Sequence, residues 1–176
     1  TCHLKWRSGV KHDCSKVMEF RTGVDGLVNG MGEQVDLEDT YVYPLLKTSE
    51  VAKENVPTPR RAVLVTQRSV GEDTAAIAEQ APRTWAYLEA HGDALDRRGS
   101  SIYRKRPRFS VFGVGDYTFL PWKVAISGFY KRTRFSIIPP FENRPVMLDD
   151  ASYFLGFQTE EEASFVHNLL ESNPAQ

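Results

Sequence analysis

The side chains best suited to binding a polyanion are concentrated in residues 97–134, which we call the basic segment. It holds ten basic residues against one acid, Asp116, an excess of +9 over 38 residues. Lysine and arginine neutralise phosphates and release counterions. Arginine binds guanine edges bidentately, aromatic rings stack on exposed bases, and glycines let a backbone approach a ligand closely. This segment interleaves all of these residue types, which favours nucleic-acid binding.

The overall charge conceals the basic segment. The 176-residue chain has a net charge of -1, so the residues outside the segment carry -10. With 41% hydrophobic and 26% charged residues, the composition is typical of a folded globular protein and not of a disordered one. The alternative interpretation of the segment is an edge strand whose charged side chains prevent it from pairing with another sheet. The local excess favours binding, to DNA, to RNA or to an acidic protein surface.

A resemblance narrows these partners. Residues 103–128, YRKRPRFSVFGVGDYTFLPWKVAISG, resemble the C-terminal target-recognition region of bacterial adenine-N6 DNA methyltransferases, in the TaqI-like specificity-domain group of restriction-modification enzymes. Residues 6–13 with 17–19, residues 43–49, and residues 144–150 before 153–155 are similar to the same proteins. The resemblance therefore extends over nearly the whole chain and implies sequence-specific recognition of double-stranded DNA.

The resemblance and the charge pattern together give the candidate DNA-binding residues. Most are expected to grip phosphates, and one or two arginines to read bases, at about 1–3 kcal/mol of discrimination each. The main set is Arg104, Lys105, Arg106, Arg108, Lys131, Arg132 and Arg134. A second set, where the resemblance begins, is Arg7, Lys11 and His12. Residues 111–127 are expected to form sheet that positions the two flanks of the main set.

Catalysis is not expected in this chain. In the enzymes it resembles, a separate domain binds S-adenosylmethionine, and an Asp/Asn-Pro-Pro-Tyr/Phe motif there holds the adenine amino group. Residues 138–141, Ile-Pro-Pro-Phe, imitate this motif, but isoleucine cannot accept the hydrogen bond. Residues 113–115, Gly-Val-Gly, precede strand-like residues and therefore do not resemble a nucleotide-binding loop. We expect an excised fragment without catalytic residues, cofactor or metal, whose parent chain carries the methyltransferase domain with S-adenosylmethionine as a partner.

Three alternatives imply different chemistry. Zinc ligands could come from the start of the chain, whose spacing fits no common zinc motif: Cys2, His3, His12 and Cys14. A nuclease could use Asp149 and Asp150 to bind a metal, although no Glu-x-Lys partner follows at strand spacing. A module that docks on an acidic partner protein is the third alternative. The salt dependence of duplex binding discriminates among these functions.

The elements that must position these residues are predicted from periodicity. Runs rich in β-branched and aromatic residues predict strands at 15–20, 61–66, 110–112, 122–127, 135–138 and 153–157. Helices are predicted over residues 72–80, from Pro82 to about residue 98, and over 159–172, where Thr159 and Glu162 form a capping box. Strands and helices do not alternate regularly, so the predicted fold is α+β: a mixed, mainly antiparallel sheet with two to three flanking helices.

One domain is predicted for residues 1–176, with an N-terminal strand and loop part (1–60) and a main sheet with helices (61–176). No apolar run approaches the roughly 20 residues that span a bilayer. The N-terminus has no apolar export signal, and the two cysteines are expected to be reduced. A cytoplasmic location without a membrane partner is therefore predicted.

Overall fold

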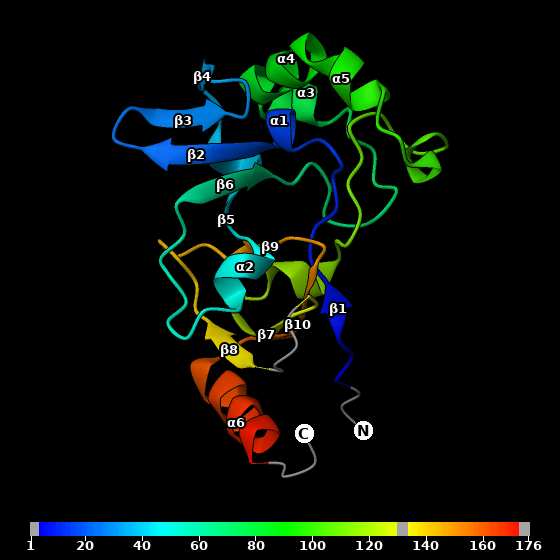
Figure 1. Ribbon diagram of the computed structural model, residues 1–176. Coiled ribbons are helices and arrows are strands. Elements are labelled where there is room, and N and C mark those ends of the chain that lie inside the picture. The colour runs from blue at the N-terminus through cyan, green and yellow to red at the C-terminus, as the bar shows by residue number, and fades with distance from the viewer. Residues whose placement is uncertain (1–3, 130–133, 173–176) are drawn as a thin grey trace.

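The computed structural model describes residues 4–129 and 134–172 and confirms the α+β class. Its strands lie in two sheets, a six-stranded sheet in the upper half of Figure 1 and a four-stranded sheet in the lower half. Three short 3-10 helices lie in the connections: η1 (Asp39–Tyr41), η2 (Ser101–Tyr103) and η3 (Asp116–Phe119). No helix in the described part of the chain is long and apolar enough to cross a membrane.

The upper sheet has the order β4 (Gln34–Val35), β3 (Gly26–Asn29), β2 (Glu19–Gly23), β6 (Arg61–Leu64), β5 (Val42–Leu46) and β9 (Met147–Leu148). Its strand pairs are antiparallel except for β5 with β9. Short helices cover its upper side in Figure 1: α1 (Ser15–Met18), α3 (Ile77–Gln80), α4 (Pro82–Ala90) and α5 (Gly92–Asp96). Phe20 of β2 packs on Tyr87 of α4, with ring centroids 5.8 Å apart, so this sheet and α4 share one apolar core.

The lower sheet is antiparallel, in the order β1 (Arg7–Ser8), β10 (Ser152–Phe157), β7 (Trp122–Ser127) and β8 (Phe135–Ile138). Helix α6 (Glu160–Glu171) covers it, with Ala163 buried against Val124 and Leu155. Thr159 caps this helix by accepting from the backbone N–H of Glu162, as the capping box predicts. Helix α2 (Thr48–Val51) lies between the two sheets in Figure 1.

Several predicted elements are confirmed and others differ: the helix predicted over residues 72–80 is limited to α3, and the helix predicted from Pro82 divides into α4 and α5. Strands β7 and β8 match the predicted residues, and β6 and β10 lie within one to two residues of them. Residues 15–20 were predicted as a strand but begin with α1, because the N–H groups of Val17 and Met18 both donate to the Cys14 carbonyl. Residues 110–112 make only a single bridge, between Phe112 and Lys11. Residues 111–127 are therefore not continuous sheet, since η3 interrupts them.

The predicted division near residue 60 does not separate the two sheets. Strand β6 begins at Arg61 but lies between β2 and β5, which come from the N-terminal part. Strand β1 likewise pairs with β10, from the far end of the chain. Each sheet therefore combines strands from both predicted parts.

The two sheets meet at a backbone crossing that leaves no room for side chains. A β-carbon on Gly9 would lie under 3.0 Å from the carbonyl oxygens of Leu148 and Asp149. A β-carbon on Gly113, whose φ is +68°, would lie equally close to the carbonyl oxygen of Gly9. We call Gly9, Gly113 and residues 148–149 the glycine crossing. Gly113 thus permits the close approach of two backbone segments of the protein itself.

Candidate nucleic-acid interface

Residues 97–108 form a loop that protrudes from the upper half of the molecule, on the right in Figure 1. We call it the basic loop. Arg98 fixes its first end: the guanidinium donates to the carbonyl oxygens of Leu95 (2.8 Å), His12 (3.1 Å) and Ser110 (2.7 Å). The same guanidinium lies 3.6 Å from the centroid of the Tyr103 ring. These contacts hold the Arg98 guanidinium within the protein and fix the start of the loop.

The second end of the loop is held by hydroxyl groups and by an aromatic pair. Thr74 donates to the carbonyl of Arg108 (2.6 Å), and Thr66 donates to that of Phe109 (2.7 Å). Tyr103 packs edge-on against Phe112, with centroids 5.3 Å apart. Both ends of the loop are therefore anchored to the body of the protein, and the segment between them projects from a fixed base.

The loop tip consists of Arg104, Lys105 and Arg106, all of which are exposed. None of the three forms an ion pair within residues 4–129 and 134–172, and Arg106 lies 5.9 Å from the Phe112 ring centroid. Arg108, predicted as a fourth contact, instead makes a bidentate ion pair with Asp96, at 2.9 and 3.2 Å. The tip therefore presents three cations whose charge no described acid neutralises.

A hollow of about 540 Å³ lies beside the basic loop. Five arginines contribute to its lining: Arg97, Arg98, Arg104, Arg106 and Arg108. Asp96 is the sole acid among the described lining residues, and Arg108 already neutralises it. The hollow thus has a net positive wall that suits an anionic or hydrogen-bond-accepting ligand.

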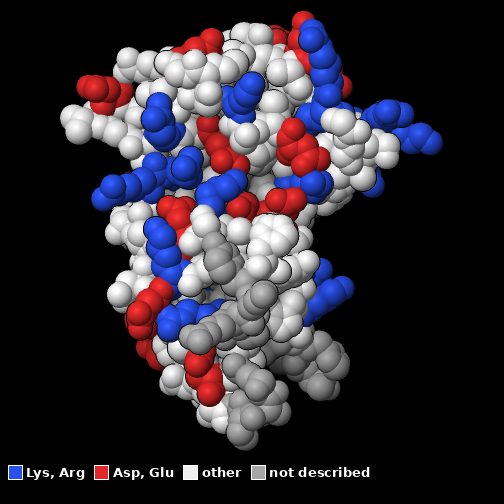
Figure 2. Space-filling model, in the orientation of Figure 1, with Lys and Arg blue, Asp and Glu red and all other residues white. Residues whose placement is uncertain are grey.

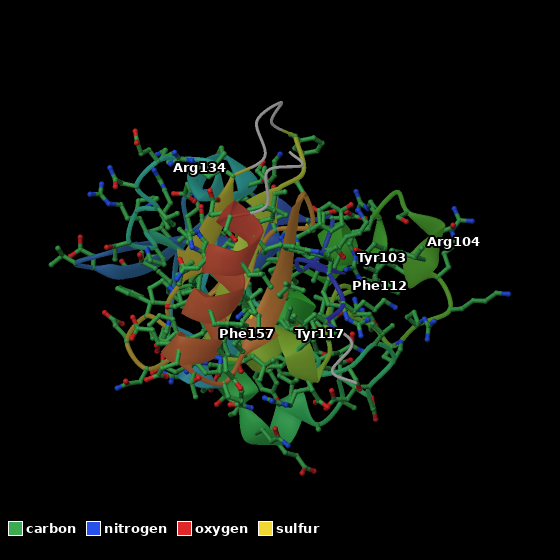
Figure 3. The ribbon with its side chains drawn as sticks, turned by 90° about the horizontal axis from the view of Figure 1, so that it is seen from below. Tyr103, Arg104, Phe112, Tyr117, Arg134 and Phe157 are labelled. Carbon is green, nitrogen blue, oxygen red and sulfur yellow. The ribbon has the colours of Figure 1, made fainter. Side chains whose placement is uncertain are left out.

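The predicted main set has a second cluster, Lys131, Arg132 and Arg134. Its described member, Arg134, does not lie beside the loop tip. Figure 3 shows Arg104 at one end of the molecule and Arg134 on another side of it. Arg134 lies 4.0 Å from Glu54. Lys131 and Arg132 lie outside the described residues. Lys123, which contributes to the charge excess, is buried, which lowers its pKa to about 7, and its Nζ donates to the Leu120 carbonyl at 2.9 Å.

The second predicted set is engaged within the protein. The guanidinium of Arg7 lies 4.6 Å from the Tyr117 ring centroid. Lys11 makes ion pairs with Asp13 (2.6 Å) and Asp150 (3.3 Å). His12 is buried: Nδ1 accepts from the N–H of Cys14, so in neutral His12 Nε2 carries the proton and donates to Glu19 at 3.0 Å.

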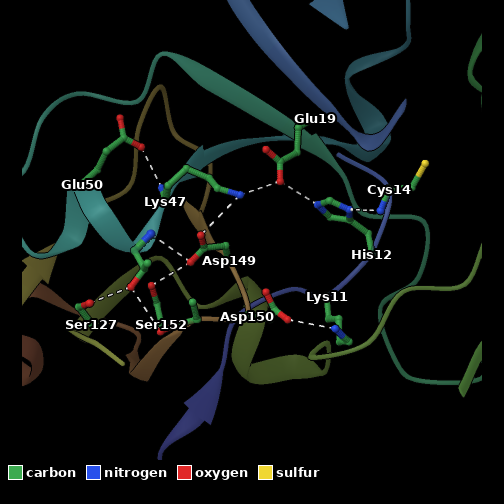
Figure 4. Close-up of polar contacts among 12 residues, drawn as sticks. Lys11, His12, Cys14, Glu19, Lys47, Glu50, Ser127, Asp149, Asp150 and Ser152 are labelled. Atoms are coloured by element: carbon green, nitrogen blue, oxygen red, sulfur yellow. Dashed lines mark hydrogen bonds and ion pairs between the residues drawn. The ribbon is translucent and has the colours of Figure 1, made fainter. Parts of the chain in front are cut away.

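Glu19 and Asp149 are buried acids of a polar network that links the sheets (Figure 4). Glu19, at the start of β2, accepts from Lys47 at 2.8 Å as well as from His12. Lys47 also lies 3.5 Å from Asp149, which accepts from the Thr48 N–H and the Ser152 hydroxyl, both at 3.1 Å. We call these residues the central polar network.

The pKa of Glu19 reports the strength of this network. Burial alone would raise that pKa, but the hydrogen bonds from His12 and Lys47 outweigh burial and lower it from 4.5 to about 2. A carboxyl group whose folded-state pKa is depressed stabilises the fold above its unfolded pKa. That stabilisation is lost as the pH falls through the folded value. The network should therefore weaken between about pH 4.5 and pH 2.

Replacing Glu19 with glutamine is expected to flatten this part of the stability profile. The carboxylate contributes on the order of 2–3 kcal/mol near neutral pH. The E19Q variant should be less stable than the wild type at pH 6 and should approach it near pH 2. Urea unfolding at a series of pH values measures the difference, with Asp25→Asn at an exposed turn as the control. Equal pH profiles for E19Q and wild type would contradict the role of Glu19.

The same contacts bear on the metal-dependent alternatives. Asp149 is buried and held by Lys47, Thr48 and Ser152, and Asp150 pairs with Lys11. In the part of the chain that the structure describes, no three His, Cys, Asp or Glu side chains are placed to hold a metal ion. Cys2 and His3, from the zinc alternative, lie outside those residues. Asp149 and Asp150 are thus engaged in structural contacts, which lend no support to a hydrolytic role.

The chain is similar in sequence to a known methyltransferase. No family model matches the chain. A type II methyltransferase of Nostoc sp., M.NspV, is 49% identical over 174 residues. The alignment covers 99% of this chain but 36% of the relative, so the chain spans about a third of that protein's length. The predicted resemblance to a methyltransferase is thereby confirmed over nearly the whole chain.

Proposed function

We propose that this chain is the sequence-recognition part of an adenine-N6 DNA methyltransferase, and that the basic loop contacts duplex DNA. The observation that carries the proposal is the exposed, unpaired loop tip of Arg104, Lys105 and Arg106 on an anchored base. The similarity to M.NspV supports the methyltransferase assignment. The motif resemblance supports adenine and a role in target recognition.

The anchoring of the basic loop suits it to positioning DNA. Contacts to phosphates fix the register of a protein on a duplex, and contacts to base edges then select the sequence. A loop held at both ends loses less conformational entropy on binding than a mobile one. Lys105 is suited to phosphate contact, whereas Arg104 and Arg106 also line the arginine-rich hollow, where they can meet a base edge.

Under this proposal, catalysis is assigned to a separate domain of a longer parent protein. The chain corresponds to 36% of M.NspV, which leaves room in such a protein for a separate domain. That domain would bind S-adenosylmethionine and the adenine to be methylated. The recognition part and the catalytic part would then contact the duplex from two sides.

A salt titration tests the proposal. Binding of a fluorescent duplex is measured by anisotropy at several salt concentrations, with unlabelled duplex of unrelated sequence as competitor. If the three tip cations each neutralise one phosphate, the slope of log K against log salt should be about -2.7 or steeper. A slope near zero, or no binding at low salt, would contradict the proposal. Magnesium-dependent cleavage of the duplex that Asp150→Ala abolishes would favour the nuclease instead.

A further inference from the structure

Two arginines face each other on the upper sheet, far from the basic segment in sequence. Arg21 of β2 and Arg61 of β6 are direct partners in an antiparallel pair. In such a pair the β-carbons lie about 5 Å apart, and like charges directly opposite each other are destabilising. Both side chains are exposed, and neither forms an ion pair with any described acid. Their mutual repulsion is therefore uncompensated in the protein alone.

A third cation and a hollow adjoin this pair. Lys16 of α1 is exposed and lines a hollow of about 290 Å³ together with Arg21 and Arg61. The hollow also presents the hydroxyl of Ser15, whereas the amide of Asn29, which lines it as well, is buried and hydrogen-bonded to Glu33 and Tyr87. Its geometry brings three cations from one helix and two strands to a single depression on the surface. Such a depression suits a compact anion.

The acid in this hollow does not neutralise the cations. Glu19 is the one acid among the described residues that line it. Its carboxylate is buried and already accepts hydrogen bonds from Lys47 and His12. The positive charge of Lys16, Arg21 and Arg61 therefore remains available to a ligand.

We infer that Lys16, Arg21 and Arg61 form a second phosphate-contact site, which binds the DNA backbone away from the basic loop. The inference rests on the proposed function and extends its contact surface. Figure 2 shows blue side chains gathered over β2 and β6 on the left of the visible face and others at the protruding basic loop on the right. Lysine and arginine side chains of these two regions thus lie on the face that Figure 2 draws.

The test removes the paired arginines and measures duplex binding in the same salt series. For R21Q/R61Q, the slope of log K against log salt should become shallower by about 1.8, which corresponds to a loss of affinity of up to about 60-fold at 0.1 M salt. The conservative R21K/R61K variant should keep the slope, because it keeps both charges. The matched control K5Q/K53Q removes the same charge from exposed lysines elsewhere.

The outcomes separate this inference from the proposed function. If R21Q/R61Q behaves like K5Q/K53Q while a basic-loop variant loses affinity, the second site is refuted and the proposed function stands. If the wild type shows no salt-dependent binding, the proposed function itself fails. Thermal unfolding provides the folding control: R21Q/R61Q should unfold no earlier than the wild type, because it relieves a repulsion between opposite side chains.

Discussion

Replacing Arg104 and Lys105 with glutamine should lower the affinity for duplex DNA by about 10- to 60-fold at 0.1 M salt. Each phosphate contact contributes about 0.9 to the slope of log K against log salt, so two contacts account for a change of about 1.8. The free energy of unfolding should stay within about 0.5 kcal/mol of wild type, because exposed side chains without partners stabilise the fold little. Anisotropy titrations and urea unfolding measure the two quantities.

Two controls make this result specific to the loop tip. The K5Q/K53Q variant carries the same change in charge and should shift the slope by much less. Arg108→Gln removes a guanidinium that already pairs with Asp96, so its effect on the slope should be smaller than that of Arg104→Gln. Equal losses for R104Q/K105Q and K5Q/K53Q would mean that overall charge, and not the basic loop, governs binding.

Replacing Gly9 with alanine should destabilise the protein by about 3 kcal/mol or more, or prevent folding. The new methyl group would overlap the backbone carbonyls of Leu148 and Asp149, which are not flexible side chains that can move aside. Hydrogen bonds from Val10 N–H to the Leu148 carbonyl (2.7 Å) and from Gly9 N–H to the Ser152 carbonyl (3.0 Å) hold the segments together. Relief of the clash would break these bonds.

The glycine at position 23 offers a matched control for this substitution. A β-carbon on Gly23 meets no atom within 4 Å, so Gly23→Ala should change the free energy of unfolding by about 0.5 kcal/mol or less. Gly113→Ala should resemble Gly9→Ala, because it combines a clash with a positive φ. Urea unfolding of the three variants provides the comparison. Equal stability of the Gly9 and Gly23 variants would show that the crossing can relax.

Local signals were sufficient to predict some of the fold. The capping box of Thr159 and Glu162 marks the start of α6, because both partners lie within one helical turn. The β-branched and aromatic runs of β7 and β8 likewise identify those strands. The turn at α1 and the role of Gly113 were not predictable in this way. The backbone that lies against Gly113 is that of Gly9, which is distant in sequence.

The candidate site was also predictable only where the signal is local in sequence. Local charge density identified the loop tip, but it also counted Lys123, which is buried, and Arg108, whose acid partner Asp96 precedes the loop. The density of charge along the chain does not reveal which cations are already neutralised. Local charge density does not single out Arg21 and Arg61, because they lie in separate stretches of the sequence. The register of β2 against β6 places them opposite each other.

The basic loop has a base that is hydrogen-bonded to the rest of the protein and a tip that, among the described residues, is not. The base of the loop shares backbone with the glycine crossing: Lys11 and Phe112 exchange hydrogen bonds of 2.9 Å one residue away from Gly113. The tip makes no ion pair with any described residue. Changes in the base would alter how the sheets join, whereas changes in the tip would leave that joint intact. A substitution at the tip can therefore change the surface that the loop presents without disturbing the contact between the two sheets, whereas a substitution at the base cannot.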